Sequence, residues 1–452
     1  MVFIERLKTA FASDARTKTI SKNVLGLGVL QGVNICVSFL LVPIVMDFVS
    51  PSQYGIWLTI SSMVSWLALL DVGLGNGMKN KLTEALAHQD MKLAKEYVST
   101  TYFLIGGIAF SFLCLTLATF PFINWSSVYN QDSSMNEVLM YTTLIVTSFF
   151  LLKLVVGLIG TILTSYLKPA SNQLINTSSN VIVLLVIWIL TKMVEGNLIV
   201  LSTILSATSV IAYFVASIYL FCGKYKQIAP SIKYFRKEHI NAILGLGLNF
   251  FVINISTIIL FQTNNFVIIH NFTNEDVVVY NLAYKLFSVC SILFMLISQP
   301  FWTAYTEAWA KKDIDWIRNT VRKVRYFWFG IIILGLFILL TSPLIYRVWV
   351  QDAVSVPLSM SIAILAYFAS HTYGGVYNIC INGIGKVRLQ MICLAIIAVL
   401  YIPLLLFCIN ILHLDILSIP LAQLLSNFYS LFIARIQYNK LVSGNARGIW
   451  NK

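Results

Sequence analysis

The stretch "TEALAHQD" at residues 83–90 returns as "TEAWAKKD" at residues 306–313, with five of eight positions identical. Each copy follows a long apolar run and opens a charged loop. Further matches occur in the same order along the chain, namely "LGLG" at 25–28 and 244–247, Tyr54 with Tyr280, and Gly106 with Gly330. This order favours an internal duplication over the chance recurrence of an amphipathic loop helix. We expect the Thr–Glu pair that opens each copy to cap and orient its helix.

The apolar runs around these stretches indicate a membrane protein. Hydrophobic residues make up 58% of the 452 residues and charged residues only 11%, against roughly 25% in ordinary soluble domains. A helix needs about 20 mostly apolar residues to cross a bilayer. We predict an all-α integral membrane protein with twelve spans, near 24–46, 54–76, 97–120, 139–165, 175–193, 198–221, 241–265, 277–303, 326–349, 357–384, 388–411 and 414–434.

Lysine and arginine indicate the orientation. The chain has a net charge of +13, and nearly all basic loop residues fall on one side of the predicted spans. The opposite loops hold only Lys192 and Arg347. Because basic loops stay in the cytoplasm, we predict that both termini are cytoplasmic. Positive charge in short loops contacts anionic membrane lipids, so no nucleic-acid partner is expected.

The duplication predicts the domain organisation. Residues 1–22 form a cytoplasmic amphipathic segment, in which Phe3, Ile4, Leu7, Ala10 and Phe11 recur at helical spacing. The remaining segments are an N-terminal six-helix bundle at 23–222, a basic cytoplasmic linker at 223–240, a C-terminal six-helix bundle at 241–437 and a cytoplasmic tail at 438–452. Both halves start on the same side, so the repeat is parallel. Transporters built in this way place their substrate between the halves and alternate access by rocking them.

Enzyme chemistry has little support in the sequence. The seven cysteines show no paired spacing, so no disulfide framework, metal site or cofactor is expected. A membrane-bound polymerase or ligase needs a sizeable external loop with catalytic charges, and the longest such loop, 121–138, holds only Asp132 and Glu137. No nucleophile–base pair or phosphate-binding loop is visible, so we predict that the protein is not an enzyme.

Two long stretches carry a family resemblance. "YGIWLTISSMVSWLALLDVGLGNGMKNKLTEALAHQD" at 54–90 and "VVVYNLAYKLFSVCSILFMLISQPFWTAYTEAWAKKD" at 277–313 resemble the Wzx-type polysaccharide flippases. These flippases belong to the MOP superfamily, which also holds the MATE drug exporters and the lipid II flippase MurJ. The resemblance implies two six-helix bundles around a central cavity, in the cell inner membrane.

The resemblance also implies a substrate. It would be an undecaprenyl-pyrophosphate-linked oligosaccharide, an O-antigen or related repeat unit, moved from the cytoplasmic to the periplasmic leaflet. A polysaccharide polymerase and a chain-length regulator would be its partners, beside the polyprenyl-pyrophosphate-linked oligosaccharide itself and membrane lipids. A MATE-like ion-coupled exporter and a MurJ-like lipid II flippase remain alternatives. A MATE-like exporter of cations should line its cavity with carboxylates, whereas the deep residues here are mainly basic.

Two lysines lie within predicted spans, where an ion costs about 2.5–3.5 kcal/mol on insertion scales. Lys153 falls near the middle of the fourth span. It either faces an anionic headgroup in a cavity or pairs with a carboxylate of a neighbouring helix. Lys285, in "YNLAYKLF", lies about one-third into the eighth span, where it either binds substrate or extends its ammonium to the membrane surface.

The repeat adds a histidine and two tyrosines. Aligning Lys168 with Lys386 sets Lys153 against His371. His371 is then either a second anion contact or proton site, or a histidine hydrogen-bonded between helices. Tyr373 and Tyr377 follow closely in sequence and could stack on sugars; packing is the alternative for both.

Asp71 lies in "LLDVGLGNG", near the cytoplasmic end of the second span. One interpretation is an ion-coupling or gating carboxylate beside a glycine-loosened helix. The other is a structural partner of Lys79 or of backbone amides freed by the glycines.

Overall fold

The computed structural model describes residues 15–451 apart from 167, 299–300 and 352. The five apolar residues of the predicted N-terminal amphipathic segment lie outside this range. Within it the chain is helical, with no strand, and divides into two compact units at Met1–Phe251 and Val252–Lys452. The division falls inside one long helix, α11 (Glu238–Asn271).

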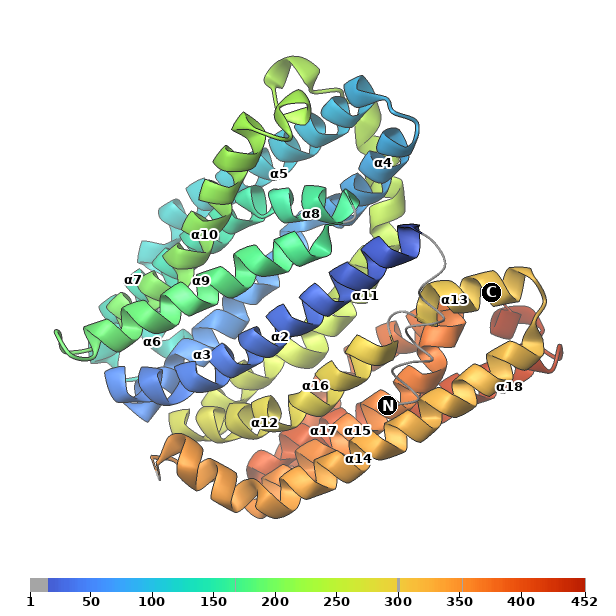
Figure 1. Ribbon diagram of the computed structural model, residues 1–452. Helices are drawn as coiled ribbons and strands as arrows, with labels where there is room; N and C mark the ends of the chain where they lie inside the picture. Colours follow the sequence, from blue (N-terminus) through green and yellow to red (C-terminus); the bar gives the residue numbers. More distant parts are fainter. Residues whose placement is uncertain (1–14, 167, 299–300, 352, 452) are drawn as a thin grey trace. The chain divides into compact units, whose positions relative to one another are not determined.

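The first unit places long helices side by side. Its helices are α2 (Ala15–Phe48), α3 (Pro51–Ser65), the 3₁₀ turn η1 (Trp66–Asp71), α4 (Leu74–Ala87), α5 (Met91–Thr119), α6 (Trp125–Val128), α7 (Asn136–Val156), α8 (Leu158–Ser165), α9 (Pro169–Leu190) and α10 (Leu198–Cys222). Helix α2 packs along α9, and α7 packs along α10 and α5 (Figure 1). Polar caps start several helices: Ser50 Oγ accepts the N–H of Gln53 at 3.2 Å, directly before Pro51.

The second unit is built around α15. Its helices are α12 (Asn274–Ser298), α13 (Phe301–Ala310), α14 (Ile314–Val350), α15 (Leu358–Ile384), α16 (Arg388–Asn410), α17 (Ser418–Ser426), the π-helical turn η7 (Tyr429–Ile433) and α18 (Ala434–Val442). Helix α15 packs against α12, α13, α14, α17 and α18. It therefore supplies the centre of this unit's apolar core.

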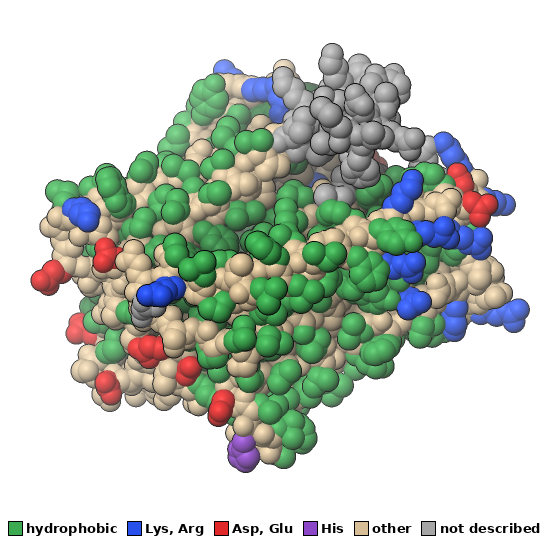
Figure 2. All heavy atoms as spheres, turned by 60° about the horizontal axis from the view of Figure 1, so that its bottom comes forward, with side chains coloured by type: hydrophobic (Ala, Val, Ile, Leu, Met, Phe, Trp, Pro, Cys, Tyr) green, Lys and Arg blue, Asp and Glu red, His purple; other side chains and the backbone are tan. Residues whose placement is uncertain are grey.

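The predicted all-α membrane fold is confirmed. Ten helical segments in the described part of the chain are long and apolar enough to cross a membrane. The two other predicted spans, at 241–265 and 357–384, coincide with α11 and α15, which have 34 and 27 residues. Figure 2 shows hydrophobic side chains covering much of one face. Within each unit, we call the end with the loops rich in Lys and Arg the basic end.

The repeated eight-residue phrase forms the same turn in both units. Helices α4 and α13 end in it, and a residue with positive φ follows, Gln89 at 59° and Lys312 at 58°. The last residue of each copy then caps the next long helix. Asp90 accepts the N–H of Leu93 at 2.9 Å, and Asp313 accepts that of Trp316 at 3.0 Å. Both units therefore turn from one helix to the next with a residue of positive φ followed by an aspartate cap.

The predicted capping role of the Thr–Glu pair is wrong for the first copy. Thr83 donates to the carbonyl of Lys79 at 2.7 Å, and Glu84 pairs with Lys81 at 2.8 Å. Thr83 is exposed inside α4, not before it, so its hydroxyl meets a carbonyl of the preceding turn and not a free N–H. The aspartate, which precedes the helix that follows, is the residue in a position to cap.

Candidate functional site

Lys153 is an ammonium group near the end of α7 with no bonding partner in the described part of the chain. Its side chain is half-buried, and the helix that carries it packs against α3, α5 and α10. Among the residues that the structure describes, no carboxylate or other acceptor lies within bonding distance of Nζ. An ion pair that fixes helix packing, the structural alternative for this residue, therefore has no carboxylate there to form it.

The backbone breaks one turn after Lys153. Gly157 separates α7 from α8, and its N–H still bonds to the carbonyl of Lys153 at 2.8 Å. A side chain at Gly157 would bring its Cβ to 2.6 Å from that carbonyl oxygen. The glycine therefore permits the tight join that places Lys153 at the end of α7.

In the second unit, Lys285 and His371 belong to two helices that pack together. Lys285 lies on α12 and is half-buried; it has an interaction partner in the structure. The adjacent Tyr284 ring lies 5.0 Å from the Phe368 ring and 6.4 Å from the Tyr367 ring of α15. Tyr367 in turn stacks on His371, with centroids 6.0 Å apart. A series of aromatic rings therefore connects the neighbourhoods of the two predicted residues.

The His371 side chain is exposed although aromatic rings surround it. Besides Tyr367, the ring of Phe261 on α11 lies 6.5 Å away in an edge-on arrangement. An exposed imidazole between the rings of Tyr367 and Phe261 can contact a polar ligand, and those rings can stack on sugar faces. Among the predicted residues of this unit, His371 is the one with both properties.

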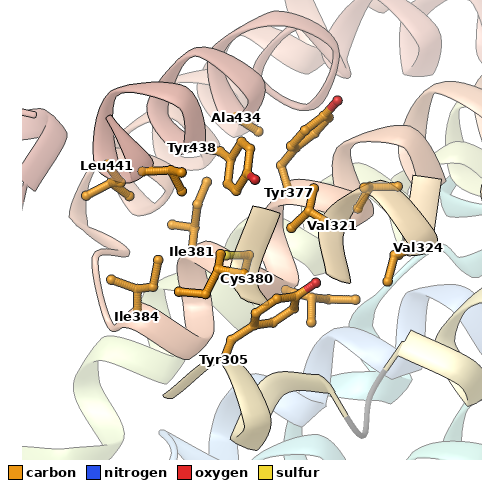
Figure 3. Close-up of a cluster of buried hydrophobic side chains, with 14 of the residues drawn as sticks. Tyr305, Val321, Val324, Tyr377, Cys380, Ile381, Ile384, Ala434, Tyr438 and Leu441 are labelled. Atoms are coloured by element: carbon orange, nitrogen blue, oxygen red, sulfur yellow. The ribbon is translucent and has the colours of Figure 1, made fainter. Parts of the chain in front are cut away.

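Tyr373 and Tyr377 do not lie with His371. Two residues along an α-helix turn the side chain by about 200°, so Tyr373 leaves α15 on the far side from His371. Tyr377 is 2% exposed and packs in the core between α14, α15 and α18, with the Tyr438 ring at 5.4 Å (Figure 3). Tyr373 accepts a hydrogen bond from Arg435 at 3.2 Å and contacts the Trp328 ring at 5.2 Å.

Asp71 caps a helix. The second predicted span is divided into α3, η1 and α4, and Asp71 ends η1. Its Oδ1 accepts the N–H of Gly75 in the first turn of α4 at 2.9 Å. Between the two helices Val72 adopts a left-handed conformation with φ 48°, followed by Gly73 with φ 78°. This geometry corresponds to the structural alternative, in which Asp71 satisfies a backbone amide freed at the break.

One polar network of the second unit could not be assembled from the sequence. Asn264 donates to the Tyr280 hydroxyl at 3.1 Å and accepts from the Tyr401 hydroxyl, and Tyr280 donates to Gln423 at 3.2 Å. All four side chains are buried, and the amide nitrogen of Gln423 has no hydrogen-bond partner among the residues that the structure describes. The polar run "FQTNNF" within a span is the signal for Asn264; its partners on α12, α16 and α17 are distant in sequence.

Comparisons with known proteins give two sequence relatives. No protein-family model matches the chain. It is 23% identical over 362 residues to a "Putative O-antigen export protein" of Yersinia pseudotuberculosis, covering 79% of this chain and 81% of that protein. It is 24% identical over 278 residues to a "Putative O-antigen transporter" of Salmonella typhimurium, covering 59% and 61%.

Solved structures show the same fold. An inward-facing multidrug resistance MATE family transporter of the MOP superfamily superposes with a TM-score of 0.76 at 13% identity, covering 92% of this chain and 96% of that one. A MOP superfamily transporter from Pyrococcus furiosus, described by a reverse polarity of its binding pocket, gives a TM-score of 0.65 at 12% identity, covering 94% and 96%. The chain shares the fold of these transporters. Together with the two O-antigen relatives, this confirms the predicted resemblance to the polysaccharide flippases of the MOP superfamily.

Proposed function

We propose, from the premise that this chain is a multi-pass membrane protein with the MOP transporter fold, that it is a lipid-linked oligosaccharide flippase. It moves an undecaprenyl-pyrophosphate-linked repeat unit, of O-antigen or a related polysaccharide, from the cytoplasmic to the periplasmic leaflet of the inner membrane. The motion is alternating access, and both chain termini face the cytoplasm. The names of the two sequence relatives support the class of substrate.

One observation carries the proposal: Lys153 is a cation within a span and has no carboxylate partner in the described part of the chain. Burying an unpaired charge costs several kcal/mol, so such a residue is retained for a ligand. A pyrophosphate supplies the opposite charge. Lys285 and His371 are proposed as further contacts of the headgroup, with the rings near His371 stacking on sugars.

The alternative is a MATE-like exporter of cationic small molecules. Its cavity would need free carboxylates to bind the cargo or a coupling ion. Asp71, the predicted candidate for that role, is bonded to the backbone of α4. An unpaired lysine would repel a cation, and we therefore favour an anionic, lipid-linked substrate over the exporter's cargo. Lipid II shares the pyrophosphate, so the names of the two O-antigen relatives, and not the lysine, favour the oligosaccharide over lipid II.

The test is complementation of a deletion strain with variants of Lys153. Lys153→Met is expected to lower surface polysaccharide about tenfold or more, because a hydrogen bond to a charged group contributes about 1.5–3 kcal/mol. Lipid-linked oligosaccharide should accumulate in the inner leaflet at the same time. Lys153→Arg, which keeps the charge, should retain most of the activity.

The matched control is Leu152→Met, because Leu152 precedes the lysine on the same helix turn and has an exposed side chain. It should complement like the wild type at equal amounts of protein in the membrane. Normal polysaccharide display by Lys153→Met would remove Lys153 from the site. A deletion strain without accumulated lipid-linked oligosaccharide would refute the flippase function itself.

A further inference from the structure

An apolar groove runs along the outer face of α5. Its floor includes Phe103, Gly107, Ser111 and Leu115, which follow one another at four-residue spacing on one face of the helix. Leu104, Ile108 and Phe112 of the same helix and Phe235 of the linker line it as well. The volume is about 560 Å³. The floor rises by about 18 Å along the helix axis, close to half of a hydrocarbon core about 30 Å thick. The groove is thus about one leaflet long.

Gly107 gives the groove its depth. A Cβ at this position would meet no heavy atom within 4 Å, and the glycine is exposed. The neighbouring Gly106 has equally open space around its Cβ but does not line the groove. The two glycines therefore lie on the same helix and are equally free of contacts, but only Gly107 lines the groove.

The linker, residues 223–240, is fixed at the basic end of the groove. Ser231 donates its N–H to Ser99 at 3.1 Å, and Arg236 donates its N–H to Thr100 at 3.1 Å. Thr100 lies one turn before Phe103, where the groove begins. These bonds hold Phe235 against α5 and place its basic neighbours, Lys233 and Arg236, beside the groove's end.

The charges at this end are mostly positive. Lys233 and Arg236 are exposed, and Lys95 of α5 lies over the Tyr234 ring at 4.6 Å. The opposing carboxylate is Glu96, whose oxygens lie 3.7 Å from Arg236 Nε and 3.0 Å from His239 Nε2. Arg236 also donates Nη1 to the carbonyls of Lys233 and Phe235, which leaves Nη2 and the Lys233 ammonium for an anion.

We propose that this groove is a binding site for an anionic phospholipid of the bilayer. One acyl chain lies on the face of α5 between Phe103 and Leu115, and the headgroup phosphate contacts Lys233 and Arg236. An apolar slot of one leaflet's length with basic residues at its surface end complements the two parts of such a lipid. The only polar floor residue is Ser111, so the groove offers an oligosaccharide nothing to bind. The occupant would tie the linker to the membrane surface.

The test uses the purified full chain, with native mass spectrometry in phosphatidylglycerol or phosphatidylcholine. Wild-type protein should retain phosphatidylglycerol in preference to phosphatidylcholine. Gly107→Leu should weaken retention roughly tenfold, since its side chain displaces methylene groups of the acyl chain from the floor. Gly106→Leu should bind like the wild type. The double variant Lys233→Gln/Arg236→Gln should bind both lipids equally.

Three results would overturn the proposal. Equal retention by Gly107→Leu and Gly106→Leu would mean that the groove is not the site, provided that both variants melt like the wild type. Equal binding of the two lipids by wild-type protein would mean that the basic end does not recognise the headgroup. Displacement of phosphatidylglycerol by polyprenyl phosphate at a much lower concentration would identify the carrier lipid as the occupant.

Discussion

Two lysines at the basic end of the first unit repel one another. Lys168 precedes α9, and Lys224 is the second residue of the linker. The nearby Lys224 ammonium, with some help from burial, lowers the pKa of Lys168 from its usual 10.5. The unfolded chain therefore binds more protons than the folded one between the lowered pKa and the ordinary pKa. In that interval the stability of the fold rises with pH.

We predict that the unfolding temperature in detergent rises, as the pH is raised toward the ordinary lysine pKa, more in the wild type than in Lys224→Met. The variant removes the second charge, so the pKa of Lys168 moves back toward its ordinary value and the folded state gains less from losing its proton. The effect should shrink as salt is added, because both side chains reach solvent. Identical pH profiles for the two proteins would mean that the two ammonium groups do not interact.

The sequence alone identified part of the candidate site. Charge and depth can be read from composition, so Lys153, Lys285 and His371 stood out among apolar neighbours. The direction in which a side chain points cannot be read from the residues next to it in the sequence. His371 and Tyr377 are both on α15, yet the His371 side chain is exposed and the Tyr377 side chain is buried in the core. The partners that distinguish them come from α11 and α18, which only the folded chain brings to α15.

At the element scale, Gly77 allows α4 and α11 to approach closely. A Cβ on Gly77 would come to 2.2 Å from the carbonyl oxygen of Ile243. We predict that Gly77→Ala destabilises the protein by about 1–3 kcal/mol, because backbone on one side cannot yield to the new methyl group. The measurement is the unfolding temperature of the purified protein in detergent.

The control for this prediction is Gly106→Ala. It makes the same change in α5, where nothing lies within 4 Å of the added atom. It should be neutral or stabilising by up to about 1 kcal/mol, since alanine favours helix more than glycine. A loss of stability as large as that of Gly77→Ala would show that the helix contact is not responsible.

The sequence predicted a helix wherever the length and hydropathy of an apolar segment determine it. The predicted spans coincide with helices or helical segments because about 20 apolar residues have few other stable forms in a membrane. The glycines after Asp71 predicted a loosened helix but not a full break of the second span, since the hydropathy is continuous over 54–76. The break depends on backbone dihedral angles at Val72 and Gly73 and on the bond from Asp71, and hydropathy reports neither.

At the scale of the whole molecule, charge asymmetry predicts topology. An even number of spans returns the chain to the side on which it began, and basic loops favour the cytoplasm. We predict that a green fluorescent protein fused after Lys452 is fluorescent and that alkaline phosphatase at the same place is inactive. Alkaline phosphatase inserted after Met193, between α9 and α10, should be active. Activity in the reverse pattern would contradict the orientation.

The left-handed residue between η1 and α4 has a mechanical consequence. Val72 holds a conformation that costs a side chain with a Cβ about 1–2 kcal/mol, and for one residue the winding sense of the second span is reversed. The ladder of backbone hydrogen bonds is therefore not continuous from α3 to α4. Helix α4 packs against the start of α5 and, through Gly77, against α11. We therefore expect any change of direction between α3 and α4 to occur at Val72 and Gly73, while α4 keeps its contacts at the basic end.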